Sequence, residues 1–91
     1  MMEFKWDERK ASANLRKQGV SFQEAATVFG DPLAITFSDP DHSEHELRFL
    51  TFRTSRANRL LVVGHTDRGG KTRIINARPI TKHERVMYEQ G

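Results

Sequence analysis

Four arginines in the second half of the chain have the chemistry to bind phosphate: Arg48, Arg68, Arg73 and Arg78. The planar guanidinium group presents paired N–H donors that match two oxygens of one phosphate. These arginines lie in segment 47–85, which carries ten basic and two acidic side chains. Such a local excess of positive charge attracts polyanions. Nucleic acid is therefore the leading predicted partner, and a solvated arginine-rich sheet surface is the alternative.

The preceding segment, 31–46, has the opposite charge, with five acidic residues and no Lys or Arg. Five side chains around it could gather a divalent cation: Asp39, Asp41, His42, His45 and Glu46. Their spacing is not typical of a metal site, and the chain has no cysteine for a thiolate site or a disulfide. We expect a solvated acidic loop, no metal and no cofactor.

The chain has 91 residues, of which 36% are hydrophobic, which predicts one domain spanning 1–91. A chain of this size buries only about 60–65% of its unfolded surface, so we expect a stabilising partner. No apolar run approaches the ~20 residues of a membrane span, and the charged N-terminus does not resemble a signal peptide. We therefore expect a cytoplasmic protein without a membrane partner.

Two short helices are predicted near the N-terminus. Asp7 is a suitable cap for a helix that ends near Gln18, and Gly19 suits the left-handed position that follows. Ser21 and Glu24 form a capping box that opens a second helix, which ends at about residue 30.

Alternating apolar residues then predict four strands, at 33–38, 46–52, 59–66 and 72–78. Thr81 and Glu84 form another capping box, which opens a C-terminal helix through about Gln90. The order α-α-β-β-β-β-α predicts an α+β fold, a two-layer sandwich in which helices cover one face of a four-stranded antiparallel sheet.

Strand parity predicts which side chains face the helices. Leu47 and Phe49 should face them, so Glu46 and Arg48 should face the open side. In a regular strand Arg73 and Arg78 lie on opposite faces, so they share one site only if the strand contains a bulge.

An ordered set of residues resembles a known family. The positions run from Phe4, Trp6, Asp7, Lys10 and Asn14, through Gly19–Phe22, Glu24, Ala25, Val28, Phe29, Asp31 and Pro32, to Asp41, His42, Glu46, Arg48, Arg59–Val63, His65, Thr66, Arg68, Arg73–Ile75, Ala77, Arg78, Glu84, Arg85 and Tyr88. This set resembles the BrnT family of toxins, the ribonuclease half of a type II toxin–antitoxin pair. The resemblance implies a RelE-like fold, metal-independent RNA cleavage and growth arrest. It also implies a BrnA-like ribbon-helix-helix antitoxin, with operator DNA bound only through the complex.

RNA cleavage without a metal needs a base, a cation and an acid near one phosphate. His65 is the first candidate base, and Glu46 is the alternative. Arg48 and Arg78 are the candidate cations. Each residue could instead have a purely structural role. His65 could be a histidine at a strand end, Glu46 could form a cross-strand ion pair, and the arginines could be surface residues.

Seven further residues are candidates for RNA contact. His83 and Tyr88 could supply the acid or stack on a base, although an exposed His83 and a Tyr88 packed under the sheet are the structural alternatives. Lys10 and Asn14 lie one turn apart on one helical face. The remaining candidates are Arg68, Arg73 and Arg85.

Three positions depart from the family pattern. Gln18 stands where histidine is usual, Asn76 replaces a serine, and Pro79 follows Arg78 where a basic residue is common. Pro79 should end its strand. The alternative function is a non-catalytic nucleic-acid-binding or corepressor module of the same toxin–antitoxin complex.

Overall fold

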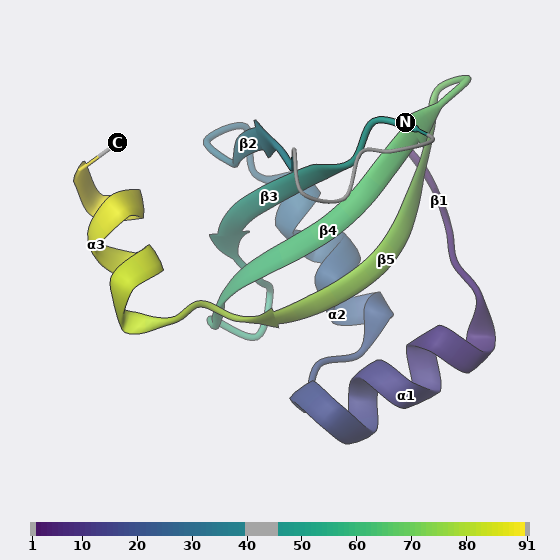
Figure 1. Cartoon of the computed structure of the whole chain (residues 1–91), viewed down its shortest axis with the longest axis horizontal. Coiled ribbons are helices and arrows are strands. Elements are labelled where there is room, and N and C mark those ends of the chain that lie inside the picture. The colour runs from purple at the N-terminus through teal and green to yellow at the C-terminus, as the bar shows by residue number, and fades with distance from the viewer. Residues whose placement is uncertain (1, 40–45, 91) are drawn as a thin grey trace.

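A five-stranded mixed sheet forms the centre of the molecule, with helices on one face (Figure 1). The computed structural model describes residues 2–39 and 46–90. Along the chain the elements are β1 (Glu3–Lys5), α1 (Glu8–Gln18), α2 (Phe22–Ala26), the 3₁₀ helix η1 (Thr27–Gly30), β2 (Ile35–Ser38), β3 (Phe49–Thr54), β4 (Leu60–Arg68), β5 (Lys71–Pro79) and α3 (Lys82–Gln90). The strand order is β1-β5-β4-β3-β2.

The prediction of a four-stranded antiparallel sheet is wrong in one respect. The four predicted strands do form an antiparallel sheet, but β1 adds a fifth strand, parallel to β5. Its three residues are too few to show an alternating pattern, and their partners lie 68 positions along the chain (Phe4 opposite Thr72). Local sequence carries no signal for such a pairing.

The first two helices begin and end where their sequence predicts. The Asp7 carboxylate accepts hydrogen bonds from the backbone of Arg9 (2.8 Å) and Lys10 (3.2 Å), and α1 ends at Gly19, whose φ is +68°. The Ser21 hydroxyl accepts a hydrogen bond of 3.0 Å from the Glu24 backbone. The second helical segment changes from α2 to η1 before it ends at Gly30.

The hydrophobic core lies between these helices and the sheet. Its largest fully buried side chains come from α2, β4 and β5 and include Phe22, Leu61 and Ile74. Trp6 packs edge-on against Phe22, with 6.0 Å between ring centroids. Helix packing therefore leaves the opposite face of the sheet, here called the open face, uncovered by α1 and α2 (Figure 1).

A bulge in β5 changes which side chains share the open face. Gly64 lies opposite Asn76 and His65 opposite Ile74, so Ile75 is an extra residue without a partner in β4. After this shift Arg73 lies opposite Thr66, and Arg78 lies opposite Val62. Thr66 and Val62 are four residues apart in one strand, so Arg73 and Arg78 point to the same face.

The strand predicted at 46–52 begins later, as β3, at Phe49. Leu47 is 66% exposed, so the expectation that it faces the helices is wrong. Residues 46–48 precede the strand, although the Arg48 carbonyl still accepts a hydrogen bond of 2.8 Å from the Asp39 backbone. β5 ends at Pro79, as predicted.

Helix α3 lies beyond the ends of the strands and stands apart from the other two helices (Figure 1). The prediction that all helices pack on one face is therefore wrong for α3. Thr81 and Glu84 form the predicted capping box, with backbone-to-side-chain bonds of 2.9 and 3.1 Å. No described helix is long and apolar enough to cross a membrane.

Candidate functional site

Six cationic side chains gather on and around the open face. The bulge aligns Arg73 with Arg78, and β1 places Lys5 beside Arg73. The group, here called the basic face, consists of Lys5, Arg48, Arg68, Lys71, Arg73 and Arg78. Two of these residues, Lys5 and Lys71, are not among the candidates predicted from the sequence. The sequence does not predict β1, which positions Lys5, and Lys71 entered the prediction only as part of the positive charge of segment 47–85.

One end of the basic face is a hollow of about 370 Å³. It is lined by Lys5, Glu46, Thr66, Arg68, Lys71 and Arg73. Glu46 forms an ion pair with Arg68, and both side chains remain accessible to solvent. At this end the Glu46 carboxylate, a candidate proton acceptor, lies among four cationic side chains.

The other end consists of two adjoining hollows that share Ile75, Asn76 and Arg78 in their linings. The central hollow, of about 280 Å³, also contains Arg48 and Asp39. The second hollow, of about 390 Å³, lies between β5 and α1 and adds Lys10, Lys17 and Gln18. Gln18 and Asn76, two departures from the family pattern, therefore line the same hollow as Arg78.

The Asn76 side chain lies directly over Gly64 of the neighbouring strand. A Cβ atom at Gly64 would approach Asn76 Oδ1 to 2.6 Å. Glycine at this position therefore gives the Asn76 amide room within the central hollow, beside Arg78.

Arg78 is held by a carboxylate of α3. Its Nη1 and Nη2 atoms donate to Glu84 Oε1 and Oε2 at 2.6 and 2.7 Å, which is a bidentate pair. Hydrogen bonding to Arg78 lowers the pKa of Glu84 from 4.5 to about 2 and raises the pKa of Arg78. The pair is fully charged at neutral pH.

The His65 ring packs on the helix side of the sheet. Its imidazole is 2% exposed and contacts the Phe29 ring edge-on, with centroids 4.9 Å apart. Nε2 lies 2.7 Å from Thr51 Oγ1, and Nδ1 lies 2.9 Å from Asp67 Oδ1. The residue also lines the central hollow with Arg48 and Arg78, but alternation along β4 turns its ring toward Phe29 of η1.

Asn14 is also buried and does not face solvent beside Lys10. Its amide group donates to the carbonyls of Val20 (2.9 Å) and Ala77 (2.8 Å) and accepts from the Ala77 N–H (3.1 Å). These bonds join α1 to the edge of β5. Asn14 lines the hollow beside α1 with Lys10 and Arg78, but its amide is already engaged by these backbone groups.

The remaining candidates lie on α3 and α1. The Tyr88 hydroxyl accepts a hydrogen bond of 2.7 Å from Arg53, which also binds Asp31, and Tyr88 lines neither the central hollow nor the hollow around Glu46. His83 is exposed, and Arg85 forms a solvated pair of 3.9 Å with Glu89. Lys10 is exposed in the hollow beside α1.

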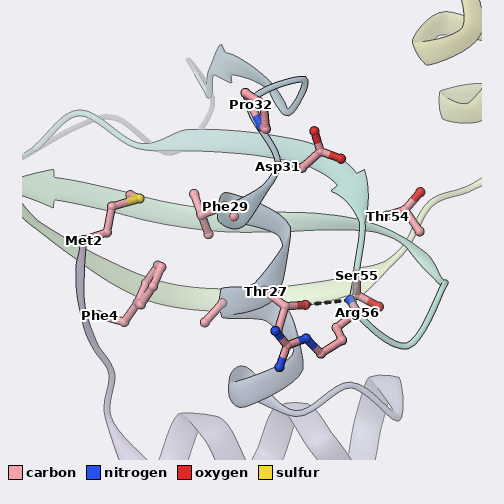
Figure 2. A pocket seen from close by; sticks show the side chains of 11 residues that line it. Met2, Phe4, Thr27, Phe29, Asp31, Pro32, Thr54, Ser55 and Arg56 are labelled. Carbon is pink, nitrogen blue, oxygen red and sulfur yellow. Dashed lines mark hydrogen bonds between the residues drawn. The ribbon is translucent and has the colours of Figure 1, made fainter.

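A further hollow lies on the helix side and lacks the cluster of cations found on the basic face (Figure 2). It has a volume of about 870 Å³, and Met2, Phe4, Phe29 and Pro32 supply much of its surface. Among its polar groups, Thr27 Oγ1 accepts a hydrogen bond from the Arg56 backbone at 2.8 Å. None of the predicted site residues lines it.

Residues 40–45 of the predicted acidic loop lie outside the described residues. They include Asp41, His42 and His45, three of the candidate metal ligands. Within 2–39 and 46–90, no three His, Asp or Glu side chains converge as metal ligands. Asp39 and Glu46 line different hollows of the basic face.

Comparisons with known proteins agree with the resemblance seen in the sequence. Residues 6–84 match the family model of the ribonuclease toxin BrnT of type II toxin–antitoxin systems. The fold is similar to that of the Brucella abortus ribonuclease toxin BrnT, with a TM-score of 0.68 and 19% identity over 90% of this chain and 100% of that one. A comparison with curated proteins finds no match.

Proposed function

Because the chain belongs to the BrnT family of ribonuclease toxins, we propose that it binds and cleaves RNA on the basic face. The observation that carries this proposal is the bulge at Ile75, which puts Arg73 and Arg78 on one face. Their partners in β4, Thr66 and Val62, are four positions apart, which corresponds to about 13 Å along the strand. Two cation clusters at this spacing suit different phosphates of one RNA strand better than a single small anion.

Glu46 is the proposed general base. It takes the proton of a ribose 2′-hydroxyl, and the 2′-oxygen then bonds to phosphorus while the bond to the 5′-oxygen breaks. The products are a 2′,3′-cyclic phosphate and a free 5′-hydroxyl, which needs a proton from solvent or a nearby acid. Arg68 and Arg73, which line the hollow with Glu46, stabilise the charge that develops on the phosphate oxygens.

This mechanism needs no metal, and it replaces His65 with Glu46 as base. His65 instead supports β3 and η1 through Thr51 and Phe29. Arg48 and Arg78 hold a neighbouring phosphate in the central hollow. Lys10 and Lys17 extend the positive surface along α1, where the RNA backbone leaves the sheet.

The test is RNA cleavage in EDTA, with identification of the 2′,3′-cyclic phosphate end. Glu46→Gln, Arg73→Ala and Arg78→Ala should each lower cleavage, and Glu46→Gln should do so with the least effect on RNA binding. Arg56→Ala is the matched control, since it removes a positive charge from the helix side. Wild-type cleavage in all three variants would contradict the proposed site.

A non-catalytic role in nucleic-acid binding is the second candidate function. The Glu46–Arg68 ion pair favours it, because the guanidinium occupies the carboxylate that would otherwise take the ribose proton. Salt-dependent RNA binding without cleavage products, in EDTA or with Mg²⁺, would support this alternative.

An antitoxin is the proposed protein partner, as in other type II toxin–antitoxin systems. We expect a BrnA-like ribbon-helix-helix protein that covers part of the basic face, binds operator DNA in the complex and acts with this RelE-like toxin in the cytoplasm. Arg73→Ala should then weaken the complex more than Arg56→Ala. An interface confined to the acidic segment 31–46 would contradict this placement.

A further inference from the structure

The Arg78 guanidinium already holds an anion of the protein's own. Both Glu84 carboxylate oxygens accept from it, at 2.6 and 2.7 Å. A phosphate group binds arginine through the same two parallel hydrogen bonds. Since the donors of these bonds are committed to Glu84, an RNA phosphate that takes the same geometry must displace the carboxylate.

Helix α3 is attached in a way that permits this displacement. None of its described side chains is buried, and Val86 is 50% exposed. Besides the Arg78–Glu84 pair, the hydrogen bond between Tyr88 and Arg53 links α3 to the sheet. The helix stands apart from the core (Figure 1), so its movement would expose little apolar surface.

Glu84 also has a second role that persists when Arg78 is released. Its carboxylate accepts a hydrogen bond of 2.9 Å from the Thr81 backbone in the capping box. The helix therefore remains capped whether or not Glu84 contacts Arg78. Loss of the ion pair moves or loosens α3 without unfolding it.

We propose that Glu84 is a built-in competitor of the RNA phosphate at Arg78, so that α3 limits access to the central hollow until RNA replaces its carboxylate. The proposal rests on the proposed function, because it assumes that Arg78 binds RNA. One anion replaces another, so the net charge around the guanidinium is unchanged during the exchange.

The test compares RNA affinities of the full chain and its Glu84→Gln variant. Glutamine keeps the helix cap, since Gln serves in a capping box as Glu does, but it removes the charge that competes with phosphate. The probe is a 2′-O-methyl oligoribonucleotide, which cannot be cleaved through its 2′-oxygen. We expect Glu84→Gln to bind about fivefold more tightly, the size of a modest ion pair.

The salt dependence provides a second readout. One newly available phosphate contact should steepen the slope of log K against log salt concentration by about 0.7. Glu89→Gln is the matched control, because it removes an equal charge from the same helix, where Glu89 is 62% exposed and lies 3.9 Å from Arg85. Its affinity should stay within about twofold of the parent.

A double-mutant cycle separates this proposal from the proposed function. Arg78→Ala should weaken binding more in the Glu84→Gln background than in the parent chain. If Glu84→Gln binds equally or more weakly while Arg78→Ala still weakens binding, Glu84 is no competitor and the proposed function stands. If Arg78→Ala changes affinity in neither background, both proposals fail at this residue.

A measurement on the unaltered protein completes the test. On titration with the oligoribonucleotide, NMR signals of the α3 backbone should shift together with those around Arg78. Saturation of the β5 signals without any change in α3 would overturn the proposal.

Discussion

The substitution Asn14→Ala distinguishes a structural role for this residue from RNA contact. Asn14 is 8% exposed and makes three hydrogen bonds, which connect α1 to the backbone of Val20 and Ala77. Alanine removes all three and leaves two carbonyls and one N–H without their protein partner. Val20 and Ala77 are themselves fully buried, so these groups lose most of their hydrogen bonding.

The cost follows from these contacts. Three hydrogen bonds contribute about 0.5–1.5 kcal/mol each, and a buried group without a partner costs about 1–3 kcal/mol. Water from the hollow beside α1, which Asn14 lines, can satisfy part of this demand, and alanine gains up to about 0.7 kcal/mol in helix propensity. We expect Asn14→Ala to lose about 2–3 kcal/mol. A chain of this size has a total stability of about 5–14 kcal/mol.

Urea unfolding followed by Trp6 fluorescence measures this loss, because Trp6 is the single tryptophan and packs on the core residue Phe22. For a slope of about 1.5 kcal/mol/M, the midpoint should fall by about 1.3–2 M. Lys10→Ala, one turn earlier on α1, should stay within about 0.5 kcal/mol of the parent. The reasoning is refuted if Asn14→Ala keeps the parent midpoint but loses RNA binding.

Three other measurements address the cap, the buried histidine and the ion pair of α3. Gly19→Ala should cost about 1–2 kcal/mol in urea unfolding, because the φ of +68° is unfavourable for residues with a Cβ; an unchanged midpoint would contradict this. His65→Ala should cost about 2–4 kcal/mol through lost packing and hydrogen bonds, and a variant that is stable but inactive would return His65 to the catalytic candidates. The pKa of Glu84 is about 2 in the folded chain, below its usual 4.5, so the ion pair stabilises α3 above about pH 4.5 and is lost as the pH falls toward 2. Since solvent reaches Arg78, the loss should be about 1 kcal/mol, and a carboxyl carbon NMR signal of Glu84 that titrates at or above pH 4.5 would contradict the assignment.

Local chemistry determined the elements that the sequence predicts well. The caps at Asp7 and Ser21 bind backbone groups two or three residues away, so their partners are already present in a short stretch of sequence. The alternating strands and the end of β5 at Pro79 have equally local causes. The ordered family positions likewise resemble those of BrnT ribonuclease toxins, and residues 6–84 match the model of that family.

Tertiary structure decided the arrangement of the site, because its causes are non-local. The pairing of Lys5 with Arg73 and the bonds between Asn14 and Ala77 join segments more than 60 positions apart. A single extra residue, Ile75, put Arg73 and Arg78 on one face, since side chains in a strand alternate with a period of two. The sequence by itself determined that the chain is basic, helical and then strand-forming. Only the folded sheet decided which cations meet, and that the side chains of His65 and Asn14 are held by hydrogen bonds within the fold.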